Sequence, residues 1–231
     1  MMQHPTSLWR RTRSLLVDGG SEPLSPFEAY ERWAATYRDC MNPVQELEDA
    51  ALRRALPELA GRSVLDVGCG TGRVTQMALD GRAAHVAGVD PSLRMLEEAR
   101  SRCGPSPPLI QGDVYALPFE ASAFDVVTCA LVLGHVERLD AALTEMNRVL
   151  RPGGCAVITG FHPFATLHGS DRTFQDAATG RTRAIIQHVH LFSDYVRAFR
   201  MHGWRMETFE EPLYAGLPLV FVLRAQKEVA T

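Results

Sequence analysis

The stretch VLDVGCGTGR at residues 64–73 decides the fold class of this chain of 231 residues. An apolar run enters a turn with three glycines, and a helical pattern leaves the turn at about Arg73. A strand–turn–helix unit of this kind lies at the carboxyl edge of an open α/β sheet, where backbone N–H groups face a ligand. We therefore expect a ligand site at this turn, which contains Gly68, Cys69, Gly70 and Gly72.

Two features of the turn narrow the choice of ligand. Arg73 stands where a dinucleotide-binding fingerprint has its third glycine, and the Gly-Lys-Ser/Thr of a phosphate-binding P-loop is absent. Asp66 precedes the glycines and would repel a diphosphate, whereas it can accept a charge-assisted hydrogen bond of roughly 1.5–3 kcal/mol from an ammonium group. The turn favours a ligand with an ammonium group, a ribose and an adenine, but no phosphate.

Two further carboxylates follow the next two predicted strands. Asp90 ends the run at residues 85–89 and can accept hydrogen bonds from both ribose hydroxyls, while Pro91 and Ser92 start the next helix. Taken alone, an Asp after a strand is as readily a helix N-cap. The glycine turn about twenty residues earlier favours the ribose role. Asp113, in Gly112-Asp113-Val114, can face an adenine amino group.

Short apolar runs alternate with helical patterns from residue 63 to residue 159. Further strands are expected at residues 109–110, 124–129 and 155–159, with a turn at 151–154. This pattern predicts a doubly wound α/β fold with a mostly parallel sheet and helices on both faces. A helix at 193–202 and two strands at 204–209 and 217–223 then predict a closing hairpin.

The segments at residues 64–73, 89–92, 112–114, 124–127 and 148–154 resemble the ordered motifs of class I S-adenosylmethionine-dependent methyltransferases. The chain is most similar to the small-molecule type-11 branch, with ubiquinone/menaquinone-biosynthetic and BioC-like enzymes. The resemblance implies seven strands in the order 3-2-1-4-5-7-6, with strand 7 antiparallel. It implies S-adenosyl-L-methionine as cofactor. The implied cofactor contacts are Tyr37, Asp66, Gly68, Cys69, Gly70, Gly72, Asp90, Pro91, Ser92, Asp113, Val114, Cys129, Ala130 and Leu131.

The chain is interpreted as a single domain with an N-terminal addition. Residues 1–60 are expected to form an arm and a helical lid, with helices that begin at Ser25-Pro26 and Asn42-Pro43. Residues 61–231 are expected to form the core. Residues 161–191 show little periodicity and are expected to be an acceptor-side loop, because long aperiodic stretches in compact domains are usually functional or disordered.

The composition of the chain argues against several classes of binding partner. The net charge of −3 gives no general attraction to nucleic acid, and the basic cluster at residues 10–13 is interpreted as a solvated arm. Five dispersed cysteines without a C-x-x-C argue against disulfides and a zinc site, and no metal is expected. Without a visible signal peptide or a membrane-spanning run, we expect a cytoplasmic, soluble monomer or homodimer.

Four of the eight histidines fall within residues 162–190. His162 and His190 flank the aperiodic stretch, and an imidazole near its ordinary pKa of about 6.5 can accept a proton at neutral pH. We therefore name these two as candidate catalytic bases. The alternative is that each histidine only hydrogen-bonds loop backbone.

The expected activity is transfer of a methyl group to an O, N, S or C atom of a small molecule by in-line displacement. Two alternatives stay open. The acceptor can be an acyl group on a carrier protein, as the BioC-like resemblance suggests, or the chain can bind the cofactor without catalysis.

Overall fold

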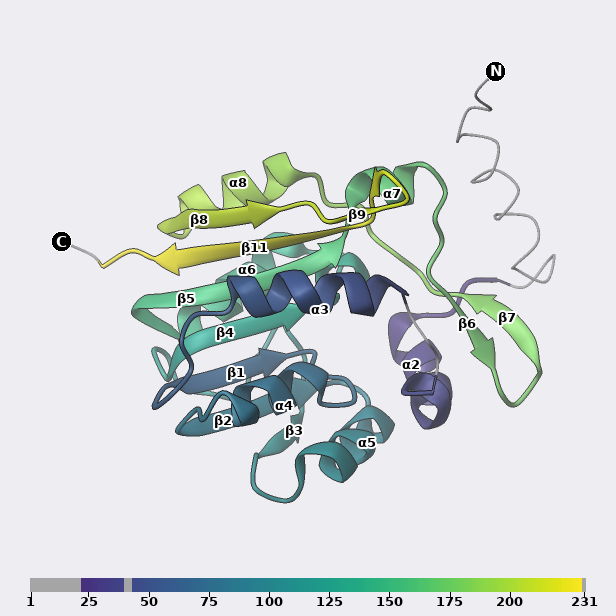
Figure 1. Ribbon diagram of the computed structural model, residues 1–231, viewed down its shortest axis with the longest axis horizontal. Coiled ribbons are helices and arrows are strands. Elements are labelled where there is room, and N and C mark those ends of the chain that lie inside the picture. The colour runs from purple at the N-terminus through teal and green to yellow at the C-terminus, as the bar shows by residue number, and fades with distance from the viewer. Residues whose placement is uncertain (1–21, 40–42, 230–231) are drawn as a thin grey trace.

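A seven-stranded sheet forms the centre of the computed structural model, which describes residues 22–39 and 43–229 (Figure 1). The strand order is β3-β2-β1-β4-β5-β11-β8, which confirms the predicted order 3-2-1-4-5-7-6. The strands are β1 (Ser63–Val67), β2 (His85–Asp90), β3 (Leu109–Gln111), β4 (Phe124–Ala130), β5 (Leu150–Phe161), β8 (Trp204–Glu210) and β11 (Val220–Lys227).

The direction of the strands also follows the prediction. β1 pairs in parallel with β2 and β4, and β5 pairs in parallel with β4. β11 is antiparallel to both β5 and β8, so the sheet ends in the expected antiparallel pair. Two minor strands, β9 (Leu213–Tyr214) and β10 (Leu217–Pro218), pair between β8 and β11.

Helices cover both faces of the sheet. α3 (Pro43–Ala55) packs on β11 and β5, and α4 (Arg73–Asp80) packs on β1 and β2. On the opposite face, α6 (Leu139–Val149) packs on β5 and α8 (Phe192–Met201) on β8. α5 (Leu93–Cys103) connects β2 to β3 and packs against both strands.

α3 belongs to the layer that covers the sheet. Its Ala51 and Leu52 are fully buried and share a core cluster with Val157 of β5 and Val222 of β11. On the neighbouring strand, Arg224 donates a hydrogen bond to the carbonyl oxygen of Ala55 at 3.3 Å. Within the predicted lid at residues 1–60, α3 is therefore packed as core.

α2 (Pro26–Tyr37) and the hairpin of β6 (Thr173–Asp176) and β7 (Arg181–Ala184) lie beyond the carboxyl ends of the parallel strands (Figure 1). Ser25 caps α2 as predicted, because its Oγ accepts from the N–H of Glu28. A separate apolar cluster joins the helix to the hairpin and comprises Leu24, Ala29, Trp33, Phe174 and Ile185.

Two local predictions are wrong. The stretch at 161–191, expected to be an aperiodic loop, contains the short helix α7 (Pro163–Leu167) and the β6–β7 hairpin. The predicted turn at residues 151–154 is a bulge within β5, because the pairing steps from Phe124–Leu150 to Val126–Cys155. Gly153 adopts φ +78° in this bulge, which a glycine tolerates without a Cβ penalty.

The basic cluster at residues 10–13, the remainder of the predicted arm up to residue 21, Cys40 and the N-cap predicted at Asn42 lie outside the described residues. Among the residues that are described, no helix is long and apolar enough to cross a bilayer.

Candidate active site

The glycine turn between β1 and α4 needs its three glycines for different reasons. All three adopt positive φ, at +69° for Gly68, +51° for Gly70 and +77° for Gly72. A Cβ on Gly68 would lie 2.3 Å from Cγ2 of Val132, and one on Gly72 would lie 2.8 Å from Sγ of Cys103. A Cβ on Gly70 would meet no atom within 4 Å. The open space at Gly70 marks where a ligand can approach the backbone.

The N–H groups of the turn are already used within the protein. Gly68 and Cys69 donate to the carbonyl oxygen of Val89, at 2.7 and 3.0 Å. The N–H of Gly70 donates to Asp90, and that of Gly72 donates to the carbonyl oxygen of Cys69. The expectation that N–H groups of this turn face a ligand is therefore wrong for these four residues.

Asp66 is buried at the end of β1 and has a defined orientation. One carboxylate oxygen accepts from the hydroxyl of Thr75 at 2.7 Å and the other from the hydroxyl of Thr128 at 2.8 Å. Burial raises the pKa of this carboxyl against the effect of both bonds. A carboxylate oxygen accepts more than one bond, so Asp66 can still take a donor from a ligand.

Asp90 lies at the end of β2, 7% exposed. Its Oδ2 accepts from the N–H of Gly70 at 2.8 Å, and its Oδ1 accepts from the N–H of Ser92 at 2.9 Å. Burial raises its pKa to about 6, against the effect of these two bonds. The N-cap of α5 is Ser92, whose Oγ accepts from the N–H of Met95, so capping does not account for Asp90.

Asp66, Gly70 and Asp90 line one cavity at the carboxyl edge of the sheet. About 810 Å³ of space lies between its lining residues, part of it open to solvent. Its wall is completed by α2, by the segment after β4 and by one residue that precedes β6. These contribute Pro26, Phe27, Tyr30, Tyr37, Leu131, Val132, His135 and Arg172.

The fold and the geometry of this cavity agree with the comparisons to known proteins. Residues 65–158, from β1 to β5, match the family described as "Methyltransferase domain". This part of the chain is similar to the class I S-adenosylmethionine-dependent methyltransferases.

Three relatives illustrate this similarity. The chain is 38% identical to a demethylmenaquinone methyltransferase of Tropheryma whipplei over 58% of each chain. It is 36% identical to a malonyl-[acyl-carrier protein] O-methyltransferase of Legionella pneumophila, over 46% of this chain and 38% of the relative. An S-adenosylmethionine-dependent methyltransferase structure from Mesorhizobium loti superposes with a TM-score of 0.66 at 26% identity, over 78% of this chain and 97% of the other. The chain spans about half the length of the two curated relatives.

The residues of the cavity fit S-adenosylmethionine, the cofactor that this family uses. Asp66 and Asp90 offer carboxylate oxygens to an ammonium group and to ribose hydroxyls, and Gly70 leaves open space beside them. Leu131, which adopts φ +60°, and Val132 supply apolar wall. A positive φ at a branched residue is strained, and such strain tends to occur at functional sites.

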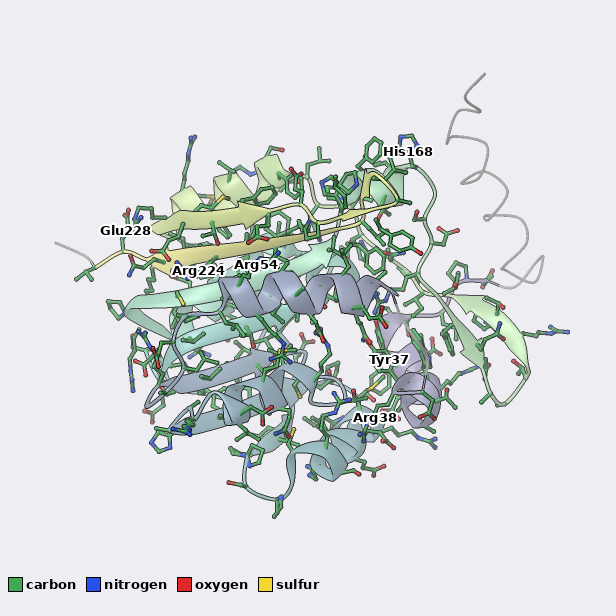
Figure 2. The ribbon with its side chains drawn as sticks, viewed as in Figure 1. Tyr37, Arg38, Arg54, His168, Arg224 and Glu228 are labelled. Atoms are coloured by element: carbon green, nitrogen blue, oxygen red, sulfur yellow. The ribbon has the colours of Figure 1, made fainter. Side chains whose placement is uncertain are left out.

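Most of the predicted cofactor contacts line the cavity. They are Tyr37, Asp66, Gly68, Cys69, Gly70, Asp90, Pro91, Ser92, Ala130 and Leu131. Figure 2 shows Tyr37 at the end of α2, near the beginning of α3, and its hydroxyl accepts a hydrogen bond from Gln45 at 2.8 Å.

Four predicted contacts are not part of the cavity wall. Gly72 faces α5, with Ala99 and Cys103 next to it. Asp113 is exposed, and its carboxylate accepts from the N–H of Tyr115. Val114 packs against the main core, and Cys129 is fully buried in that core.

His162 and His190 also lie outside the cavity wall. His162 caps α7 by accepting from the N–H of Phe164, and its Nε2 lies 2.8 Å from a carboxylate oxygen of Glu211. Nε2 of His190 bonds the carbonyl oxygen of Val136 at 2.8 Å. His190 thus bonds loop backbone, which is the alternative considered for the histidines, whereas His162 bonds the backbone of α7 and a side chain.

The sequence reasoning missed a chain of three polar side chains in the wall. Arg172 donates from Nε to the Tyr30 hydroxyl at 3.1 Å, and this hydroxyl lies 3.0 Å from Nε2 of His135. Nδ1 of His135 lies 3.3 Å from the carbonyl oxygen of Ile186, which can only accept, so the proton belongs on Nδ1. Nε2 is then free to accept from Tyr30.

This arrangement fixes the charges of the three groups. Burial raises the pKa of Tyr30 to about 12. Burial and the positive charge of Arg172 lower the pKa of His135 to about 3. Tyr30 and His135 are therefore neutral at physiological pH, and Arg172 carries the only charge of the three.

Proposed function

We propose that the protein transfers a methyl group from S-adenosylmethionine to a small-molecule acceptor. The observation that carries this proposal is the pair of buried carboxylates, Asp66 and Asp90, on one cavity beside the open backbone at Gly70. The family that residues 65–158 match uses the same cofactor, and the matched residues include all three positions.

The residues of this chain would act mainly by binding and alignment. The bound cofactor supplies an electrophilic methyl group on its sulfonium sulfur. Asp66 would accept from the ammonium group and Asp90 from the ribose hydroxyls, which fixes the direction in which the methyl group points. Leu131, Val132 and Met95 would exclude water from the rest of the cavity. Alignment of the reactants can account for roughly 7–11 kcal/mol of barrier lowering.

α2 is proposed as the lid of this site, since it supplies Phe27, Tyr30 and Tyr37 to the wall and lies beyond the carboxyl ends of the strands. The use of His162 or His190 as a base stays a prediction. We also propose that the protein is cytoplasmic and acts as a monomer or homodimer, without a nucleic-acid partner. Cell fractionation and light scattering of the purified protein test these assignments.

Calorimetric titration with S-adenosylhomocysteine tests the binding half of the proposal. Asp90→Asn should raise the dissociation constant by at least about tenfold, because two hydrogen bonds to a charged acceptor are weakened. Asp80→Asn is the matched control, because Asp80 is exposed at the end of α4, outside the cavity, and it should leave the dissociation constant unchanged. Equal effects of the two substitutions would contradict the proposed site.

A test of methyl transfer itself requires that the acceptor be identified. The protein is incubated with a metabolite extract and either S-adenosylmethionine or its trideuteromethyl form. Products that gain 14 mass units with the first cofactor and 17 with the second identify the acceptor. Formation of product only with isolated acyl carrier protein would favour the carrier-protein alternative, and absence of any product in the presence of tight binding would favour a non-catalytic role.

A further inference from the structure

Arg172 is a buried cation on the wall of the proposed site. The residue is 4% exposed, and its guanidinium lies 4.9 Å from the ring centre of Phe161. Its Nε donates to the hydroxyl of Tyr30 at 3.1 Å. Within residues 22–39 and 43–229, its two terminal nitrogens form no hydrogen bond and no carboxylate forms an ion pair with it.

The second arginine of the cavity wall is paired. Arg73 forms an ion pair with Glu48 at 2.7 Å and another with Asp49. The negative charge that Arg73 needs is thus supplied by α3, which packs beside it. Burial of a cation without an anion is costly, so the contrast between the two arginines indicates that Arg172 is prepared for an anion from outside the chain.

The immediate neighbours of Arg172 cannot neutralise it. Tyr30 and His135 are both neutral at physiological pH, and they take up only the Nε–H of the guanidinium and the hydroxyl proton of Tyr30. They fix the orientation of the guanidinium and leave its two terminal nitrogens available. A guanidinium in this state is suited to a planar carboxylate, which accepts two parallel hydrogen bonds.

The position of these residues in the sequence points to the acceptor instead of the cofactor. Of the predicted cofactor contacts that line the cavity, all but Tyr37 lie within residues 65–158, the part of the chain that matches the family. Tyr30 and Arg172 both lie outside it, on α2 and just before β6. Phe27, Leu131 and Val132 border the same cavity and would contact an apolar body.

We propose that the methyl acceptor is an apolar molecule with a carboxylate group, and that Arg172 binds this carboxylate with both terminal nitrogens. Tyr30 and His135 act as positioning residues for the guanidinium. The inference rests on the proposed function, because it assigns the acceptor part of the same cavity.

The probe is benzoate, with benzamide as its neutral counterpart of equal shape. Each is titrated by NMR chemical-shift perturbation into protein saturated with S-adenosylhomocysteine. Benzoate should bind at least about tenfold more tightly than benzamide, and the comparison needs no variant. Equal affinities, or no binding of benzoate at tens of millimolar, would overturn the proposal.

Variants then assign the selectivity to Arg172. Arg172→Lys keeps the charge but loses the planar fork, and it should weaken benzoate by at least about tenfold while the affinity for S-adenosylhomocysteine changes less than about twofold. Arg181→Lys, at an exposed position of β7 in the same hairpin, should change neither affinity. Tyr30→Phe should also weaken benzoate, because it removes the acceptor of the Nε–H.

Two outcomes separate this inference from the proposed function. Parallel loss of S-adenosylhomocysteine affinity in Arg172→Lys would overturn the inference alone, since the guanidinium would then serve the carboxylate of the cofactor. Failure of the wild-type protein to bind S-adenosylhomocysteine would overturn both.

Discussion

The buried carboxyl of Asp90 should make cofactor affinity depend on pH. Burial raises its pKa to about 6 in the free protein. Ribose hydroxyls donate to the ionised form, so binding favours ionisation and requires a proton to leave. With a pKa of about 6, roughly one tenth of Asp90 is ionised at pH 5 and roughly nine tenths at pH 7. The affinity for S-adenosylhomocysteine should therefore be about tenfold weaker at pH 5 than at pH 7.

Loss of affinity in acid cannot be an indirect effect of Asp90 on folding. A carboxyl with a raised pKa in the folded state contributes stability that is fully present below its ordinary pKa of 3.8 and is lost as the pH rises through about 6. As far as Asp90 is concerned, the fold becomes more stable between pH 7 and pH 5. The sign of the effect on binding is thus opposite to the sign of the effect on stability.

Isothermal titration at pH 5, 6 and 7, in buffers of different ionisation enthalpy, measures the affinity and the number of protons released together. Release should rise toward one proton as the pH falls below 6. Asp90→Asn should bind weakly and lose this part of the pH dependence. An affinity that is equal at pH 5 and pH 7, or a slope that Asp90→Asn retains, would refute the reasoning.

Three further predictions test the surrounding structure. Gly68→Ala should lower the free energy of unfolding by about 1–2 kcal/mol because of the positive φ, and by a further amount because the new Cβ overlaps Val132. Combining it with Val132→Ala should restore the part due to the overlap, as measured by urea unfolding. Burial raises the pKa of Asp125, but hydrogen bonds from Ser63 and Arg151 outweigh burial and lower it to about 2. The contribution of Asp125 to stability is therefore present above 3.8 and lost as the pH falls through about 2. Asp125→Asn should cost about 1–2 kcal/mol at pH 7 and nothing well below pH 2, as measured by urea unfolding. His162→Ala should cost about 1 kcal/mol of stability through loss of a helix cap, and neither it nor His190→Ala should change the affinity for S-adenosylhomocysteine in calorimetry.

The strand order and the glycine turn could be predicted from the sequence because both depend on local pattern. Apolar runs that are buried on both faces indicate parallel strands, and the burial of all five residues of β1 explains why Val64 and Leu65 are apolar at consecutive positions. Asp66 and Asp90 follow strands directly, so their position at the carboxyl edge is set by the strands themselves.

The part of the cavity wall that contains Tyr30, His135 and Arg172 could not be predicted, because these residues come from segments far apart in the sequence. Tyr30 and Arg172 are 142 residues apart, and Tyr30 and His135 are 105 apart. The β6–β7 hairpin that follows Arg172 is short and mostly polar, so its strands lack the alternation of apolar and polar residues that would predict them. Asp176 and Gly180 at its turn are the one cue that turn chemistry offers, since Gly180 adopts φ +67° and its N–H donates to the carbonyl oxygen of Asp176.

A crystal structure of the protein with S-adenosylhomocysteine tests the central claim most directly, which is that the cavity at the carboxyl edge holds the cofactor. The account predicts both ribose hydroxyls within hydrogen-bonding distance of the Asp90 carboxylate, and the ammonium group nearest to Asp66, with the ligand passing over Gly70. Binding elsewhere on the molecule, or in this cavity with the ribose away from Asp90, would contradict it.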